Sequence, residues 1–398
     1  MVHQPTITST EMRGINRSAI LELIRRESPI ARTTIAQRLG ISLPTVMRIV
    51  DELVGEEFVR SQGKTEWSGG RRRPLLEFNA DGYVVLGVDM AGTKKIYGAI
   101  SEIGGNIIDE MEMERRGASG EKCYDLLTKL IDALLASSGL KGRKVRGIGV
   151  GAPGITHHRE GIVKWAYALN WKDFPLKDRL SKRYKLPITV DNDVNLAALG
   201  EHWFGAGQHA QNMVLIVVSA GIGAGIIING TLYRGSKEAS GEIGHMIPGW
   251  DFLGKSYLDF GALESVASGT GMIRHARTVL KSKSDAGDLD HLLAEDVFES
   301  ARQGQKWASS IVHEVVDYLA IAVANLSVSF DPELIVLGGG VTNFADMLVG
   351  PILSRIEGII PTPPKLVASS LGLRATVMGA IITVLHNTSN FYVVHKLS

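Results

Sequence analysis

Two different spacings of apolar residues divide the chain into a short helical front part and a longer body. Apolar side chains recur at helical intervals up to about residue 55, whereas from residue 83 onward they gather in short runs of strand length. Polar residues 79–82 lie between the two patterns. The pattern predicts two units, 1–80 and 81–398, and 398 residues are enough to fill two or three hydrophobic cores.

The front part predicts three short helices. Ser18 is placed to cap a first helix, which ends at Ser28-Pro29. Gly40 closes a second helix and Ser42 begins a third. The apolar face of the third helix consists of Val46, Ile49, Val50 and Leu53. A small residue at Ala36, a glycine four residues later and an apolar residue six beyond that are typical of a helix-turn-helix.

Two strand-like runs, Glu57–Arg60 and Pro74–Phe78, flank a glycine-containing basic tip and predict a wing. The exposed face of the third helix carries side chains able to reach base edges in the major groove, namely Ser42, Thr45 and Arg48. The tip carries side chains suited to phosphates or to the minor groove, namely Arg71, Arg72 and Arg73. A winged helix that binds protein instead of DNA would have the same pattern, but the basic tip favours DNA.

The body begins with a buried strand that ends in an acid, Val84–Asp89, followed by a turn through Gly92, Thr93 and Lys94 and by a second strand. Backbone amides at such a turn can hold phosphate, and the carboxylate can hold hydrated magnesium. A plain hairpin would have nearly the same sequence.

Two further glycine-rich segments follow predicted strands. The strand 213–218 leads into 219–225, which contains Gly221 and Gly223. The strand 334–337 leads into Gly338, Gly339 and Gly340. Segments of this kind let a nucleotide lie against the backbone. A long buried helix at 307–326 precedes the second of them, and a last helix at 376–385 ends the pattern.

Candidate chemistry centres on Gly241–His245. Glu242 and His245 lie three residues apart and would project from one face of a helical turn. This pair suits a sugar, a metal ion or an ordinary surface loop. Asp193 is expected at the start of a helix that ends at Trp203, where it either accepts a proton or hydrogen bond from a hydroxyl group or caps the helix. Asp191 or Asn192 could provide that cap instead.

The composition excludes several classes of protein. The single cysteine, Cys123, rules out an intrachain disulfide and a zinc site built from cysteines, and it fits a reducing cytoplasm. Residues 1–17 lack the apolar core of a signal peptide, and no membrane association is expected. Basic residues outnumber acidic ones within 1–80 and not in the remainder, as expected for a nucleic-acid-binding front part.

With these motifs together, residues 15–385 resemble the ROK family (repressor, open reading frame, kinase), in particular its members with an N-terminal winged helix. Asp89-x-x-Gly92-Thr93-Lys94 is similar to the first phosphate motif of the actin and hexokinase superfamily, and Gly241–His245 is similar to the family's sugar signature. The resemblance implies an α/β fold: a two-lobed, actin/hexokinase-like ROK domain preceded by an α+β winged helix-turn-helix. Lobe 1 would comprise about 81–191 and 376–398, and lobe 2 about 192–375.

The resemblance also implies a set of site residues. The sugar site would be lined by Asn192, Asp193, Glu242, His245 and Glu264. Asp193 would be the base of a kinase, and Gly338–Gly340 would lie beside the adenosine.

Departures from the family pattern affect the metal and phosphate sites. The three cysteines that usually join the signature histidine on zinc are replaced by Lys255, Tyr257 and Ala262, so zinc is not expected. Ala91 and Ala220 replace a glycine and a threonine of the two phosphate motifs. The replacement of a Pro-Asn pair by Tyr167-Ala168 removes one sugar contact.

The sequence therefore predicts a cytoplasmic, sugar-responsive transcriptional regulator, a repressor of carbohydrate-utilisation genes. Its partners would be a double-stranded DNA operator, a sugar or sugar phosphate effector, and a second copy of the chain in a homodimer or dimer of dimers. No cofactor is required. The alternative is an ATP-dependent hexose or N-acetylhexosamine kinase, which would use ATP, magnesium and Asp193.

Overall fold

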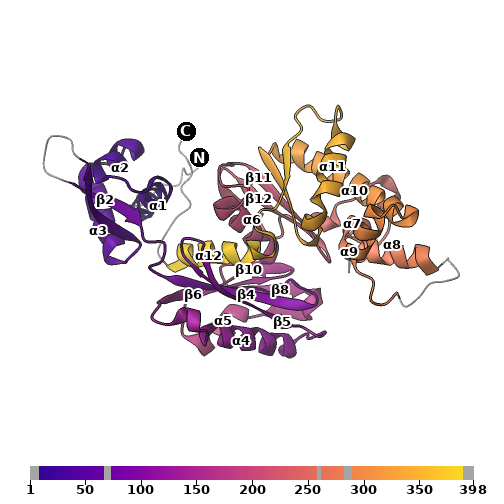
Figure 1. The fold of residues 1–398 in the computed structure, drawn as a ribbon, viewed down its shortest axis with the longest axis horizontal. Coiled ribbons are helices and arrows are strands. Elements are labelled where there is room, and N and C mark those ends of the chain that lie inside the picture. Colours follow the sequence, from indigo (N-terminus) through magenta and orange to yellow (C-terminus); the bar gives the residue numbers. More distant parts are fainter. Residues whose placement is uncertain (1–8, 67–72, 258–260, 282–288, 389–398) are drawn as a thin grey trace, which may run out of the picture.

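The computed structural model describes residues 9–66, 73–257, 261–281 and 289–388 (Figure 1). A small module at one end, shown in indigo, is followed by two larger units that each contain a sheet. The α/β architecture with a winged helix in front confirms the predicted fold class. The two large sheets lie within the ranges expected for the two lobes, and the exact division of the chain into lobes stays a prediction.

The front module contains three helices and a two-stranded wing. Its elements are α1 (Ser9–Glu27), α2 (Arg32–Leu39), α3 (Leu43–Gly55), β1 (Val59–Glu66) and β2 (Arg73–Phe78). The apolar face predicted for α3 is fully buried. Gly40 ends α2 with φ +64°, the left-handed conformation that glycine adopts without strain.

The start of the first helix was predicted wrongly. The helix begins at Ser9, and Ser18 lies inside it, where its hydroxyl donates to the Gly14 carbonyl at 3.0 Å. A serine whose hydroxyl donates to the carbonyl four residues earlier can lie in the middle of a helix without ending it. Ser42 does occupy the N-cap position of α3, but its hydroxyl pairs with that of Thr45 at 2.8 Å and not with the backbone.

Sheet 1 has the order β10-β6-β3-β4-β5, in which β10, β6 and β3 are parallel and β4 and β5 are antiparallel. Its strands are β3 (Val84–Asp89), β4 (Lys95–Glu102), β5 (Ile107–Glu114), β6 (Val145–Ala152) and β10 (Ile188–Asn192). The helices that accompany it are α4 (Glu121–Leu135), α5 (Leu176–Tyr184) and the short η1 (Ser138–Leu140). A small antiparallel sheet lies between β6 and α5 in the chain and comprises β7 (Ile155–His157), β8 (Ile162–Ala166) and β9 (Trp171–Phe174), with η2 (Tyr167–Leu169).

Sheet 2 has the order β13-β12-β11-β14-β15. Its strands are β11 (Met213–Val218), β12 (Ile222–Ile228), β13 (Thr231–Tyr233), β14 (Leu334–Gly338) and β15 (Lys365–Ala368). The α-helices of this unit are α7 (Glu264–Ala267), α8 (Gly269–Lys281), α9 (Ala294–Arg302), α10 (Lys306–Phe330) and α11 (Val349–Ile356). Its single turns and short 3₁₀ helices are η3 (Ile243–His245), η4 (Trp250–Phe252), η5 (Gly340–Met347) and η6 (Gly372–Arg374).

The segment 219–225 is a tight hairpin turn and not the long phosphate loop that was expected. β12 already begins at Ile222, so Gly223 and Gly225 lie within a strand. A Cβ atom on Gly225 would lie 2.3 Å from the Cβ of Ala198, and one on Gly223 would lie 3.1 Å from a methyl group of Val194. These two glycines therefore allow the helix α6 (Asp193–Phe204) to pack closely on β12.

α10 is the central core helix of the second unit. It is long and apolar enough to cross a membrane by length and composition alone, but 56% of that apolar window is buried inside the protein. Its buried side chains, such as Ile311, Val315 and Leu319, pack with β11, β12 and β14. Such burial is typical of a core helix, although part of its apolar surface faces outward.

α6 and α12 (Ala375–Thr388) lie in direct backbone contact and connect the two sheets (Figure 1). A Cβ atom on Gly379 would lie 1.7 Å from the Leu196 carbonyl oxygen, and one on Gly200 would lie 2.1 Å from that of Ala375. α12 also packs on β3 and β6 of sheet 1, whereas α6 packs on β11 and β12 of sheet 2. The two helices therefore join the two sheets.

The front module packs along one side of α12 and against the C-terminal end of α6. Met378, Ile381 and Val384 of α12 share one buried cluster with Ile20 and Ile24 of α1. The Arg25 guanidinium of α1 lies 4.8 Å from the ring centre of Trp203, whose indole lies 5.8 Å from the imidazole of His386. Burial lowers the pKa of His386 to about 4, so this imidazole is neutral at physiological pH.

Gly379→Ala is expected to destabilise the protein by roughly 1–3 kcal/mol or more, because the added methyl group would force α6 and α12 apart. Urea unfolding measures the loss. Gly350→Ala in α11 is the matched control, since a Cβ there meets nothing within 4 Å and alanine favours the helix by up to ~1 kcal/mol. Equal stability of the two variants would contradict the close crossing.

Candidate functional site

Two aspartates meet at one edge of sheet 1. β10, β6 and β3 are parallel, and both Asp89 and Asp191 stand in register with Gly151 of β6. Asp193 follows directly after β10 as the first residue of α6. The carboxyl ends of these strands therefore place Asp89 and Asp193 together, at the edge where ligands bind in open α/β sheets.

The two carboxyl groups hold their protons unusually tightly. Burial raises the pKa of Asp89 to about 6, although the Ala91 amide, 2.8 Å from its Oδ1, and the Thr376 hydroxyl favour the ionised form. Burial also raises the pKa of Asp193 well above its usual range, and the nearby Asp89 and Glu242 carboxylates raise it further. Buried carboxyl groups with raised pKa values are typical of functional sites that bind a hydrogen-bonding ligand.

The cap of α6 is provided by Asn192. Its side-chain oxygen accepts from the Asn195 amide at 2.9 Å. Its side-chain nitrogen donates to the Gly154 carbonyl at 2.9 Å and to the Asp193 carboxylate at 3.1 Å. The sequence left open whether Asp193 or a neighbour caps α6, and the structure shows that Asn192 does. Asn192 also holds the Asp193 carboxylate in place through a hydrogen bond.

The Gly241–His245 segment forms one turn pressed against β12. Gly241 has φ +91°, and a Cβ there would lie 1.9 Å from the Ala224 carbonyl oxygen. The His245 amide donates to the Glu242 carbonyl at 3.1 Å, which closes the turn η3. Burial raises the pKa of Glu242, His245 opposes this shift and Glu264 adds to it. The three side chains therefore lie close enough to interact electrostatically.

Glu264, at the start of α7, links this turn to the hairpin between β11 and β12. Its Oε2 accepts from the Ile222 amide at 2.9 Å. A Cβ on Gly221 would lie 2.6 Å from that oxygen, and one on Gly244 would lie 2.9 Å from it. Both glycines leave room for the Glu264 carboxylate, whose pKa is raised by burial.

The structure thus gathers five expected residues, Asp89, Asp193, Glu242, His245 and Glu264, into one electrostatic cluster that draws on both sheets. Carboxylates accept hydrogen bonds from hydroxyl groups, and an imidazole can donate or accept one. A neutral ligand with several hydroxyl groups can donate hydrogen bonds to these carboxylates without adding negative charge. The arrangement can also accept a hydroxyl proton, which a phosphoryl transfer requires.

The chain matches the ROK family over residues 85–387 and a winged helix-turn-helix DNA-binding family over residues 15–60. The chain belongs to the ROK family. The match covers both sheets and every residue of the acidic cluster.

Known ROK proteins similar to this chain include regulators and kinases. A xylose repressor of Caldicellulosiruptor bescii is 29% identical over 396 residues, which are 96% of this chain and 98% of that protein. A glucokinase of Halalkalibacterium halodurans is 40% identical over 286 residues, 68% of this chain and 84% of the kinase. The crystal structure of a ROK family transcriptional regulator, a homologue of the E. coli MLC protein, has a TM-score of 0.83 at 25% identity and covers 95% of this chain and 98% of its own. The full-length matches confirm the prediction of a ROK transcriptional regulator with a winged helix.

Two polar contacts beside the ROK sugar signature, an ion pair and a glutamate–histidine contact, were missed from the sequence. The Arg234 guanidinium donates hydrogen bonds to both oxygens of the fully buried Asp191 carboxylate, at 2.8 and 2.6 Å. The Glu238 carboxylate accepts from the His158 backbone amide at 2.6 Å and lies 2.9 Å from that residue's imidazole. The first pair ties the segment before Gly241 to the edge strand β10 of sheet 1, and the second ties it to the small sheet just after β7. No sequence spacing marks them, because each partner comes from a distant part of the chain.

The expected nucleotide segments lie in three turns of the ROK body. Gly92, Thr93 and Lys94 form the exposed turn between β3 and β4, and a Cβ on Gly92 would lie 1.9 Å from the Lys95 carbonyl oxygen. Gly338 ends β14, Gly339 has φ +88°, and Gly340 begins η5. A Cβ on Gly339 would lie 2.3 Å from the Val218 carbonyl oxygen, so the triple glycine lies beside the β11–β12 hairpin.

The residues at the usual ROK zinc positions do not fit a zinc ion. Ala262 is buried, Lys255 is exposed, and the Tyr257 ring packs 6.1 Å from that of Phe252. An alanine and a lysine offer no thiolate to share with His245. Within the part of the chain that the structure describes, no three His, Cys, Asp or Glu side chains gather as a metal site requires. The expectation of a zinc-free protein stays a prediction.

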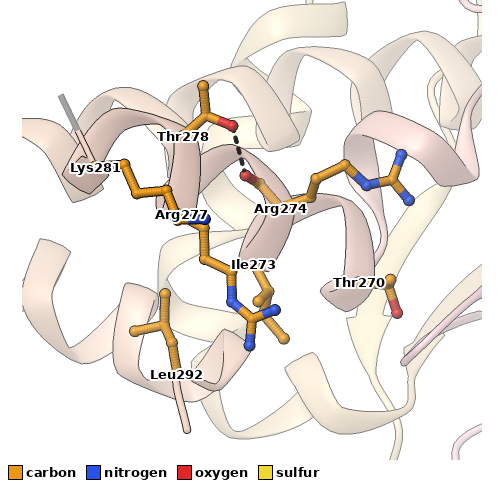
Figure 2. Close-up of a pocket in the computed structure, with 7 residues that line it drawn as sticks. All are labelled: Thr270, Ile273, Arg274, Arg277, Thr278, Lys281 and Leu292. Carbon is orange, nitrogen blue, oxygen red and sulfur yellow. Dashed lines mark hydrogen bonds between the residues drawn. The ribbon is translucent and has the colours of Figure 1, made fainter. Parts of the chain in front are cut away.

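A basic cavity of about 440 Å³ lies along α8, away from the sugar signature (Figure 2). Figure 2 shows the side chains of Arg274, Arg277 and Lys281 projecting from this helix, with the Thr278 hydroxyl donating to the Arg274 carbonyl at 3.0 Å. None of the predicted sugar-binding side chains lines it.

The winged helix exposes the residues predicted to read DNA. Arg48 and Ser42 are exposed on α3 and Thr45 is partly exposed. Met47 and Leu43, missed from the sequence, are 45% and 38% exposed on the same helix and suit contact with thymine methyl groups. The predicted contacts Arg71 and Arg72 lie outside the described residues, and Arg73 begins β2.

Asp89→Asn is expected to stabilise the ligand-free protein at pH 7.5 and to have no such effect near pH 3.5. The folded-state pKa of about 6 exceeds the ordinary value of 3.8, so Asp89 favours folding when protonated and loses that contribution as pH rises through 6. The gain is at most ~3 kcal/mol, because one pKa unit corresponds to ~1.4 kcal/mol. The asparagine oxygen can still accept from the Ala91 amide.

Thermal and urea unfolding at both pH values measure this change. The exposed Glu357→Gln is the control and is expected to change little at either pH. A gain of equal size at both pH values, or a loss at pH 7.5, would contradict the raised pKa of Asp89.

Proposed function

We propose that this protein is a sugar-responsive transcriptional repressor. The winged helix binds an operator in double-stranded DNA, and the acidic cluster binds a neutral sugar or a sugar phosphate. The protein acts in the cytoplasm as a homodimer, because winged-helix regulators read two half-sites. The full-length similarity to a xylose repressor supports the repressor role, and a pentose or hexose is the expected effector class.

One observation carries the proposal: α6 and α12 connect the cluster with the DNA-binding module. Both helices begin at the cluster, where the Thr376 hydroxyl lies 3.3 Å from the Asp193 carbonyl oxygen. Near their C-terminal ends, Trp203 of α6 lies beside Arg25 of α1, and His386 of α12 packs against Trp203. A sugar that prefers one closure of the two sheets would shift these helices and hence the winged helix.

Gel shifts with DNA from upstream of the protein's own gene test this function. We expect the protein to retard this DNA specifically, and we expect Arg48→Ala to abolish that retardation. One sugar among xylose, glucose and N-acetylhexosamines should change the affinity for the DNA at least about 10-fold. Glu242→Gln should keep DNA binding and weaken the sugar effect about 10- to 100-fold, because a hydrogen bond to a charged group contributes roughly 1.5–3 kcal/mol. Retardation of unrelated DNA with equal affinity would overturn the proposal.

The connecting helices are tested by Trp203→Ala in the same assay. Loss of the indole removes the contact with Arg25, so sugar and DNA should each still bind while the effect of one on the other falls. Trp203→Phe keeps a ring beneath the guanidinium and should restore the coupling. An unchanged sugar effect in Trp203→Ala would exclude this route.

A second candidate, an ATP-dependent sugar kinase, is favoured by the position of Asp193 next to Asp89 and by the 40% identity to a glucokinase. Asp193 would take the proton of the attacking hydroxyl, and Asp89 would hold hydrated magnesium. A coupled assay with ATP, magnesium and a hexose, performed on the protein and on Asp193→Asn, decides the matter. Turnover that falls at least 100-fold in the variant would support the kinase, and equal traces would exclude it.

A further inference from the structure

Two aromatic side chains are exposed on the segment that leads from β8 into η2. Trp165, near the end of β8, is 51% exposed, and Tyr167, the first residue of η2, is 63% exposed. Their neighbours Ala166 and Leu169 are buried in the hydrophobic core of sheet 1. The core therefore fixes the backbone of this segment and leaves both rings to solvent. Single exposed apolar residues are ordinary, so the position of these two rings decides what they can do.

Trp165 lies next to the residues that position Asp193. A Cβ on Gly154 would lie 2.1 Å from the Trp165 carbonyl oxygen, so the two backbones are in contact. The Gly154 carbonyl accepts from the Asn192 side chain at 2.9 Å, and the same side chain donates to the Asp193 carboxylate at 3.1 Å. Gly154 therefore connects Trp165 to the edge of the acidic cluster.

The other end of the segment is tied to the turn that follows Asp89. The almost fully buried Arg115 donates from its guanidinium to the carbonyl of Ala168, the residue after Tyr167. Another nitrogen of the same guanidinium lies 3.5 Å from the Gly92 carbonyl oxygen, in the turn between β3 and β4. The segment is therefore fixed beside each of the two aspartates at the edge of sheet 1, and its exposed rings border the acidic cluster on the solvent side.

The acidic cluster and the two rings suit different parts of a carbohydrate. Carboxylates and an imidazole form hydrogen bonds with hydroxyl groups. An exposed indole or phenol ring offers a flat apolar face, which can pack on the C–H face of a sugar ring and remove apolar surface of both from water. A site that encloses a small ligand buries most of that ligand's surface. Because each aromatic ring is more than half exposed, it lies outside the part of the site that would enclose a first sugar ring.

We propose that the effector is a neutral disaccharide or longer oligosaccharide, with one sugar ring in the acidic cluster and the next ring stacked on Trp165 and Tyr167. We call these two residues the aromatic rim. The inference rests on the proposed function, because it takes the acidic cluster as the site of the first ring. The exposed Lys172 stands opposite Trp165 on β9 and makes a sugar phosphate the competing ligand, but two aromatic rings favour a second sugar ring over a phosphate group.

Isothermal titration calorimetry of the full-length protein with matched sugars tests the aromatic rim. The pairs are xylose with xylobiose and glucose with cellobiose, and glucose 6-phosphate represents the sugar phosphates. We expect one disaccharide to bind at least about 10-fold more tightly than its monosaccharide, which corresponds to ~1.4 kcal/mol. Trp165→Ala and Tyr167→Ala should each weaken disaccharide binding about 10-fold more than monosaccharide binding, whereas Trp165→Phe should keep most of the preference. Ile359→Ala, at a residue 70% exposed in the loop after α11, is the control and should keep the preference unchanged.

The same titrations separate the rim from the proposed function. Equal affinity for each monosaccharide and its disaccharide, or an equal loss for both sugars in Trp165→Ala, would overturn the second-ring site. Tighter binding of glucose 6-phosphate than of either disaccharide would also overturn it. In these cases a monosaccharide or sugar phosphate that still changes DNA binding leaves the proposed function standing. Binding of no sugar at all would overturn both.

Tryptophan fluorescence gives a second measurement that does not depend on a loss of affinity. Stacking of a sugar ring on Trp165 replaces water on an exposed indole, so the disaccharide should shift or quench the emission. This change should disappear in Trp165→Phe while calorimetry still records binding of the disaccharide. An emission change of equal size in Trp165→Phe would overturn the placement of the second ring on the aromatic rim.

Discussion

The backbone contact between α6 and α12 is the constraint on which the rest of the structure depends. Gly200 and Gly379 allow the two helices to approach so closely that neither position has room for a Cβ atom. α12 also packs closely on sheet 1, where a Cβ on Gly87 would lie 2.7 Å from a methyl group of Val377. Because one helix is packed on each sheet, any change in the angle between the sheets must move one helix along the other. In the proposed function, the same two helices carry this change to the winged helix.

The acidic cluster is held in a state that is unfavourable for the empty protein. Asp89, Asp193, Glu242 and Glu264 all have raised pKa values, mainly because they are buried, and among the described residues no basic group lowers the pKa of Asp193. The surrounding chain is held by strong contacts that do not involve the ligand, such as the buried pair of Asp191 and Arg234. Contacts beside the site thus stabilise the fold, and the carboxylates inside the site stay available to accept hydrogen bonds from the hydroxyl groups of a ligand.

The sequence predicted the parts of the fold that depend on local patterns. The helix-turn-helix, the hairpin after Asp89, the core helix α10 and the triple glycine were all recognisable, because periodicity and glycine position are local properties. Strands β7 to β9 and helix α5 were missed, since they are short and lack a clear period. The long-range contacts could not be predicted either. The bridge from Arg234 to Asp191 joins residues 43 positions apart, and no spacing along the chain specifies it.

The glycines of the phosphate motifs have a different meaning in the structure from the one their pattern suggested. Gly223 and Gly225 make room for α6, Gly221 makes room for the Glu264 carboxylate, and Gly339 approaches Val218. Each is required by packing within the protein, whether or not a nucleotide binds. Their presence therefore says little about ATP, whereas the alanine at position 220 removes a hydroxyl that phosphate could use. Burial raises the pKa values of Asp89, Asp193, Glu242 and Glu264, so ionising these carboxyl groups is costly in the folded protein. In the proposed function the hydroxyl groups of a sugar offset that cost, so the acids support sugar recognition more directly than the glycines support nucleotide binding.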